Sequence, residues 1–116
     1  MIEPERRGLV LASALSAALA IATAAFGAHG AGNEQAANWL RTGGTYQLIH
    51  AVAAIALMQL APRAAWVMLI GAGLFAGTLY AMALGAPHWL GAITPIGGLL
   101  MIGAWLAVAM AALRAR

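Results

Sequence analysis

Charged residues are confined to four short segments of this chain, and this confinement limits the folds that it can adopt. Three long uncharged stretches separate those segments, at 8–33, 42–62 and 64–113. A helix that crosses a bilayer needs about 20 apolar residues. The first two stretches each accommodate one such helix, and the third accommodates two if a turn forms at 85–88. We therefore predict an all-α integral membrane protein, a four-helix bundle in a single transmembrane domain covering 1–116.

The composition excludes the other broad classes of protein. Hydrophobic residues make up 64% of the 116 residues and charged residues only 8%, and the mean hydropathy is +0.88. So few charges cannot cover the surface of a soluble domain. The chain has no cysteine for a disulfide framework, and it is too hydrophobic for disorder. Its net charge of +3 comes without a basic patch among aromatic residues, so we expect no nucleic-acid partner.

Charges and turn-forming residues set the expected helix bounds. The four membrane spans are predicted at about 8–29, 45–61, 64–84 and 90–113. The segment between the first two spans carries helix signals of its own, with Asn33 as an N-cap and Gly43 as a residue that ends a helix. We therefore expect a short amphipathic helix at about 33–43, lying on the outer membrane surface.

The arginines predict the orientation of the chain. Four spans place both termini and the turn at 61–63 on one side of the membrane, and the opposite side carries Arg41 alone. The arginines of the first side are Arg6, Arg7, Arg63, Arg114 and Arg116. Short basic loops stay in the cytoplasm, so we predict a multi-pass protein of the cell inner membrane with both termini cytoplasmic. A cleaved secretory signal is the alternative, but the first apolar run is longer than such a signal needs.

Small residues recur at helical spacing on the first and third spans. They run from Ser13 to Ala28 on the first span, and Gly73 and Gly77 form a small-xxx-small pair on the third. Small residues let membrane helices approach closely. These faces predict internal helix packing, with a homo-oligomer interface as the alternative. Membrane lipids and a larger membrane complex are the other expected partners.

Uncharged polar residues and histidines gather at one expected depth. Counting about 1.5 Å per residue from the predicted span ends places them near the outer face. The candidate polar layer consists of His29, Tyr46, Gln47, His50, Tyr80 and Thr94. Unpaired polar groups are costly in hydrocarbon, so these side chains are expected to bond one another. The layer is then either structural, or a pocket around His50, Tyr80 and Thr94 that binds or transports a small molecule, an ion or a lipid.

A helix break is expected at the start of the last span, at Gly91, Pro95, Gly97 and Gly98. The ring of Pro95 would collide with the carbonyl of Gly91 in a regular helix. Either the helix kinks there, or it begins there with Thr94 as the N-cap. Both versions leave irregular backbone that must be buried in protein or line a cavity.

The residues offer little chemistry for catalysis or for a cofactor. No nucleophile stands with a base, and no glycine-rich loop follows a strand. The three carboxylates lie outside the spans, which argues against a proton-coupled exporter, and the unbalanced loop charges argue against a dual-topology fluoride channel. His29 and His50 are weak candidates for metal or haem ligands, so no cofactor is expected. We therefore expect a non-enzymatic accessory or scaffold-type bundle.

Four sequence blocks resemble a known family. They lie at 24–30, 46–51, 74–80 and 90–98, and the last reads Leu-Gly-Ala-Ile-Thr-Pro-Ile-Gly-Gly. In this order they resemble the domain of unknown function 423 family, the YgdD-like small membrane proteins. The resemblance covers nearly the whole chain and implies a four-helix inner-membrane protein without an assigned activity.

The family's motif carries over residue by residue. The matching positions are Gly27, His29, Tyr46, Gln47, His50, Gly77, Tyr80, Thr94, Pro95, Gly97 and Gly98. Ala76 and Thr78 stand where the family pattern leads us to expect serines. This departure weakens any role for hydroxyl groups on the third span.

Overall fold

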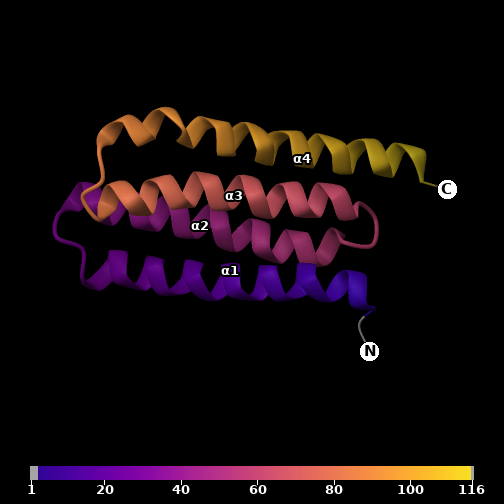
Figure 1. Cartoon of the computed structure of the whole chain (residues 1–116), viewed down its shortest axis with the longest axis horizontal. Helices are drawn as coiled ribbons and strands as arrows, with labels where there is room; N and C mark the ends of the chain where they lie inside the picture. Colours follow the sequence, from indigo (N-terminus) through magenta and orange to yellow (C-terminus); the bar gives the residue numbers. More distant parts are fainter. Residues whose placement is uncertain (1–2, 116) are drawn as a thin grey trace.

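Four long helices run alternately up and down along a common axis in the computed structural model, which describes residues 3–115 (Figure 1). They are α1 (Pro4–His29), α2 (Glu34–Leu57), α3 (Pro62–Ala83) and α4 (Thr94–Arg114), with a short 3₁₀ helix, η1 (His88–Ala92), before the last. No strand occurs in the part of the chain that is described. The predicted all-helical fold is confirmed; Arg116, one of the arginines counted above, lies outside the described residues.

The helices form a shallow layer. α2 packs between α1 and α3, and α3 also packs against α4, whereas α1 and α4 lie at opposite edges (Figure 1). The Cα atoms extend over 50 × 30 × 18 Å, so the molecule is thin in one direction. Both termini and the α2–α3 turn lie at one end of the layer, which is the arrangement expected of four antiparallel spans (Figure 1).

Three segments are long and apolar enough to cross a membrane, namely α1, α3 and His88–Arg114, which combines η1 with α4. α2 is not among them, although its 24 residues extend for about 36 Å. Its composition follows from its position, because it lies between two other helices and buries glycines, Gln47 and His50. A helix surrounded by protein needs fewer apolar residues than one that faces lipid.

The separate surface helix expected at 33–43 is wrong. Asn33 does cap a helix, and its side-chain oxygen accepts a hydrogen bond from the backbone N–H of Ala36 at 2.8 Å. That helix is α2, which continues unbroken through Gly43 to Leu57.

α2 continues through two adjacent glycines, and both lie where α2 contacts a neighbouring helix. A Cβ atom on Gly43 would lie 2.7 Å from Cε1 of Tyr80, and one on Gly44 would lie 2.9 Å from the carbonyl oxygen of Ala20. Both distances are too short for a side chain, so the glycines allow α1, α2 and α3 to approach closely. This close contact outweighs the tendency of glycine to end a helix.

α4 begins at Thr94, and Ile93 alone separates it from η1, so the helix starts at the expected break and does not kink there. Pro95 is its second residue, where a missing N–H costs no helical hydrogen bond. Ile93, and not Thr94, occupies the N-cap position, and it makes no side-chain cap. Gly97 then allows α4 to approach α3, since a Cβ atom there would lie 2.5 Å from the backbone nitrogen of Phe75.

The small-residue pair on α3 does not take part in the internal packing that the sequence predicts for it. A Cβ atom on Gly73 or Gly77 would meet no atom of the described residues within 4 Å. α3 instead approaches α4 at Gly71, where a Cβ atom would lie 2.8 Å from that of Leu100. On α1, Ser13 and Ala20 are fully buried and face the other helices, whereas Ala28 is exposed.

Candidate functional site

Gln47 connects three helices. Its side-chain nitrogen donates to Oγ of Ser16 on α1 at 3.0 Å, and the Tyr80 hydroxyl on α3 donates to its side-chain oxygen at 2.6 Å. Gln47 itself is only 5% exposed, so both hydrogen bonds are sheltered from lipid. The sequence pointed to Gln47 and Tyr80 but not to Ser16, since a serine on a face rich in alanine gives no distinct signal.

His50 connects α2 to α4. The indole N–H of Trp105 donates to its Nε2 at 3.0 Å, and its Nδ1 lies 2.7 Å from the backbone carbonyl oxygen of Tyr46. An indole nitrogen only donates and a carbonyl oxygen only accepts, so Nε2 is the acceptor and Nδ1 carries the proton. These two partners therefore assign a neutral imidazole whose nitrogens are both engaged.

Trp105 is a hydrogen-bonding residue that sequence reasoning missed. Its ring centroid lies 6.0 Å from that of His50, and the two rings meet edge to face. Tryptophan in membrane proteins favours the interfaces with water. Trp105 lies eleven residues after Thr94, far from either end of α4. This position away from the interfaces is the signal that could have identified Trp105 as a hydrogen-bond donor inside the layer.

Two threonines connect α3 to α4. The hydroxyl groups of Thr78 and Thr94 lie 2.6 Å apart, and both side chains are buried. Each hydroxyl also lies near a backbone carbonyl oxygen, that of Thr78 at 3.0 Å from Phe75 and that of Thr94 at 3.3 Å from Leu90, and either threonine can donate to the other. The threonine at position 78, where the family pattern led us to expect a serine, therefore still supplies a hydroxyl group that bonds to another helix.

The structure does not bring His50, Tyr80 and Thr94 into one pocket. Tyr80 bonds within the α1–α2–α3 group, His50 lies between α2 and α4, and Thr94 lies between α3 and α4. Tyr46 supplies its backbone carbonyl to His50, and its ring packs edge to face on Phe75 with centroids 5.0 Å apart. The polar residues therefore form three separate contacts between helices, Ser16–Gln47–Tyr80, His50–Trp105 and Thr78–Thr94, which together are called the polar network.

These contacts lie at different positions along their helices: Thr94 is the first residue of α4 and Tyr80 lies in the last turn of α3, whereas His50 lies well inside α2. His50 stands about 24 Å along the axis from the first residue of α2 and about 10 Å from the last, at about 1.5 Å per residue. The expected depth assumed a span that begins near Thr45. Because α2 begins at Glu34, its polar residues Gln47 and His50 lie further from the start of their helix than expected.

His29 stands apart from the network. It is the last residue of α1 and is exposed, so it does not share a site with His50. No group of three histidine, cysteine, aspartate or glutamate side chains in residues 3–115 is arranged to hold a metal ion. A metal on His50 would have to displace one of its two hydrogen bonds.

Two adjoining grooves open between α2 and α4 with α3 as their floor. One, of about 360 Å³, is lined by Tyr46, His50, Phe75, Gly98, Met101, Ile102 and Trp105. The other, of about 380 Å³, is lined by Trp39, Phe75, Leu79, Met82, His88, Gly91, Thr94 and Pro95. The grooves meet at Phe75, and the helix-break residues Gly91, Pro95 and Gly98 line them.

Comparisons with known proteins point to one family. The family described as protein of unknown function DUF423 matches residues 23–98. UPF0382 membrane protein SSP2132 of Staphylococcus saprophyticus is 36% identical over 107 residues, which cover 84% of this chain and 89% of its own. UPF0382 membrane protein YwdK of Bacillus subtilis is 33% identical over 117 residues, covering 90% and 95%.

A third similar protein carries a more specific name. UPF0382 inner membrane protein YgdD of Escherichia coli is 29% identical over 119 residues, which cover 93% of this chain and 91% of its own. No solved structure matches. The range matched by the family includes Gln47, His50 and Thr94, whereas Ser16 and Trp105 lie outside it.

Proposed function

The chain belongs to the DUF423 family of proteins of unknown function, and we propose that it acts as a non-enzymatic accessory or scaffold-type protein of the inner membrane. In this proposal all four helices cross the membrane and both termini lie in the cytoplasm. The end with the termini carries Arg6, Arg7, Arg63 and Arg114, and the other end carries Arg41. Basic residues favour the cytoplasmic side.

The observation that carries the proposal is the mutual pairing of the polar side chains between the helices. Gln47 uses its donor and its acceptor on two neighbouring helices, and His50 uses both ring nitrogens within the chain. A proton path or a catalytic base needs a titratable group with an atom available to bond to a substrate or to water. A network in which the members bond one another instead fixes how neighbouring helices align.

The shape of the molecule also supports a scaffold role. α1 and α4 each bury four residues, whereas α3 buries ten. A thin layer offers its broad faces and its two edges to lipids, to a second copy or to another membrane protein. A path through the membrane would need further chains, because α1 and α4 lie at opposite edges and do not close around a centre.

Co-purification tests the scaffold role. The full chain would be extracted from its native membrane in mild detergent, and the bound proteins would be identified by mass spectrometry. We expect one membrane protein in fixed proportion, which is lost when Leu106→Trp enlarges a 63% exposed side chain on the outer face of α4. A chain that purifies alone, or a companion protein that edge variants of α1 and α4 leave bound, contradicts the scaffold role.

Cysteine labelling tests the orientation. The chain has no cysteine, so Ala115→Cys and Gly32→Cys each introduce a single thiol at one end of the molecule. A membrane-impermeant maleimide added to intact cells is expected to label the variant at 32. The variant at 115 is expected to react only after the membrane is opened. The reverse pattern contradicts the cytoplasmic termini.

A second candidate function is the binding of an apolar molecule from the lipid phase. The groove lined by Tyr46, Phe75 and Trp105 supports it, because an apolar groove with few polar groups is typical of small-molecule sites. Gly98 lines this groove and has open space around its Cβ position, so Gly98→Leu fills the groove without a clash. Gly103→Leu is the matched control, because Gly103 is equally open but does not line the groove.

Mass spectrometry of co-purified small molecules tests this binding. We expect one species enriched over the bulk lipid in the wild-type protein and in Gly103→Leu, and lost from Gly98→Leu. Bound molecules that mirror the bulk membrane in all three proteins contradict a specific groove ligand.

A further inference from the structure

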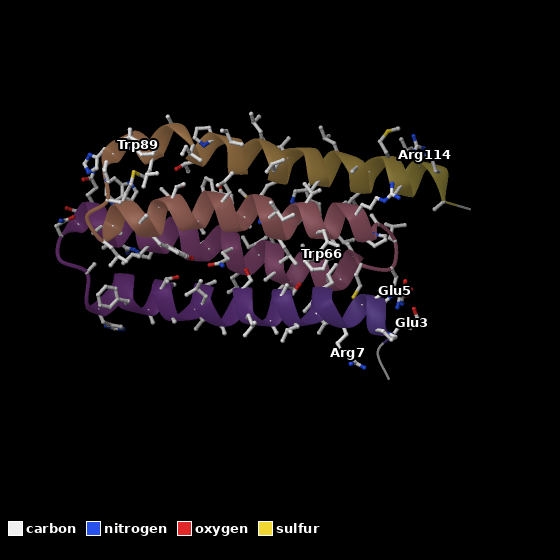
Figure 2. All side chains as sticks on the ribbon, in the orientation of Figure 1. Glu3, Glu5, Arg7, Trp66, Trp89 and Arg114 are labelled. Carbon is white, nitrogen blue, oxygen red and sulfur yellow. The ribbon has the colours of Figure 1, made fainter. Side chains whose placement is uncertain are left out.

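A pocket at the end with both termini combines a cation, an anion and an aromatic ring. It has a volume of about 220 Å³, and its polar and aromatic lining comes from Glu5, Arg6, Gln59 and Trp66. Figure 2 shows Glu5 at this end of α1 and Trp66 further along the layer on α3. None of these residues belongs to the polar network between the helices.

The floor of the pocket is apolar. Leu9 lines it, is 2% exposed and packs in the hydrophobic core with Ala51 and Leu69. Trp66 extends from α3 toward α1, since a Cβ atom on Gly8 would lie 4.0 Å from its Cζ2. The pocket is therefore amphipathic, with an apolar base and a charged mouth at the ends of the helices.

The charged side chains retain much of their bonding capacity. Arg6 Nε lies 3.9 Å from a carboxylate oxygen of Glu3, which is the only ion pair within residues 3–115. A guanidinium group carries five N–H donors, so this long contact leaves the others for a ligand. Glu5 makes no ion pair in the same part of the chain, although it lines the pocket beside Arg6.

We propose that this pocket binds the phosphoethanolamine headgroup of a membrane lipid, with the phosphate on Arg6 and the ammonium on Glu5. Arginine suits phosphate because its planar group donates two parallel hydrogen bonds. A purely anionic headgroup would meet the carboxylate of Glu5, and the quaternary ammonium of choline has no N–H to donate to it. The half-exposed ring of Trp66 adds a face that attracts a cation.

The position of the pocket fits a lipid headgroup. Arginine and tryptophan at the ends of membrane helices lie at the level of the headgroups. Leu9 and Met58 extend the pocket toward the apolar part of the helices, where acyl chains lie. The inference does not depend on the scaffold role or on which side of the membrane this end faces.

Native mass spectrometry tests the proposal with the full chain in detergent. The protein would be titrated with phosphatidylethanolamine, phosphatidylglycerol and phosphatidylcholine that share the same acyl chains. We expect phosphatidylethanolamine to bind most tightly. Arg6→Gln is expected to weaken all three lipids, and Glu5→Gln to remove the preference for ethanolamine, each by roughly two- to fivefold, the effect of one exposed charge contact.

Arg7→Gln is the matched control, because it removes the same charge from the next residue. Arg7 is exposed, does not line the pocket and points away from the other helices (Figure 2). We expect its lipid binding to equal that of the wild type. Equal losses in Arg6→Gln and Arg7→Gln, or a preference for phosphatidylglycerol that Glu5→Gln leaves intact, overturn the proposal.

Soluble O-phosphoethanolamine separates a lipid ligand from a free phosphate compound. It carries the same charges without acyl chains, so we expect it to bind far more weakly than the lipid. Binding as tight as that of phosphatidylethanolamine overturns the assignment to a membrane lipid.

Discussion

The inner helices α2 and α3 differ from the edge helices α1 and α4 in burial and in hydropathy. In soluble proteins the most apolar segments are the most buried, and here the order is the reverse. One half of the most apolar window of α3 is buried, against 17% for the corresponding windows of α1 and of the segment with α4. Yet the edge segments are the more apolar, and α2 is too polar to qualify as a span by itself. In this molecule hydropathy therefore marks contact with lipid, whereas glycine and hydrogen-bonding side chains mark contact with protein.

The largest expected effect comes from a glycine at the contact between an inner and an edge helix. Gly97→Leu places a side chain against the backbone of Phe75, which cannot move aside. We expect a loss of about 3 kcal/mol or more in unfolding free energy, or no folded protein, because overpacking a tight contact is costly. The adjacent Gly98→Leu fills open space and is expected to fold normally in a thermal melt in detergent. Equal melting of the two variants contradicts the close α3–α4 contact.

A smaller effect is expected at the hub of the polar network. Gln47→Leu leaves both Ser16 and Tyr80 without their partner. The expected loss of unfolding free energy is roughly 1–2 kcal/mol, as for hydrogen bonds between membrane helices. Gln35→Leu is the control, because Gln35 is exposed in the first turn of the same helix. Equal unfolding free energies of the two variants in chemical denaturation would contradict a stabilising role of the polar network.

Trp105→Phe tests the contact between α2 and the edge helix α4. It keeps an aromatic ring and removes the N–H that donates to His50. We expect a loss of about 1 kcal/mol in unfolding free energy, the value of one net hydrogen bond. Trp89 is 66% exposed in η1, so Trp89→Phe is expected to change little. If Trp105→Phe is as stable as Trp89→Phe, His50 is held by other contacts.

The smallest expected effect is the difference in unfolding free energy between substitutions of two serines on α1. Ser16 accepts a hydrogen bond from Gln47, whereas Oγ of Ser13 is buried and has no partner among the described residues. Ser13→Ala removes an unsatisfied group and is expected to be neutral or slightly stabilising. Ser16→Ala is expected to cost about 0.6 kcal/mol, the average for such bonds in membrane proteins. The opposite order in a parallel unfolding measurement contradicts the network as drawn.

The charge pattern was enough to predict four helices with both termini at one end, because bilayer thickness ties span length to uncharged sequence. The start of α2 was not predictable in this way. Gly43 was predicted to end a helix, and only the contacts of Gly43 with Tyr80 and of Gly44 with Ala20 explain why the helix continues. The earlier start also changes the positions of Gln47 and His50 along their helix.

The candidate site was predictable as a set of residues but not as a set of partners. Gln47, His50 and Thr94 stand out as polar positions in apolar sequence, since burying such groups requires a bond. Their partners are decided by packing: Trp105 is 55 residues from His50 along the chain. The spacing of the two residues in the sequence does not predict this contact.

A double-mutant cycle on Gln47 and Tyr80 tests the central claim most directly, namely that the polar residues of the inner helices stabilise the layer by bonding one another. The unfolding free energies of wild type, Gln47→Leu, Tyr80→Phe and the double variant would be measured in one detergent. The hydrogen bond at 2.6 Å predicts a coupling of roughly 0.6–1.7 kcal/mol between the two side chains. Strictly additive losses would contradict the account.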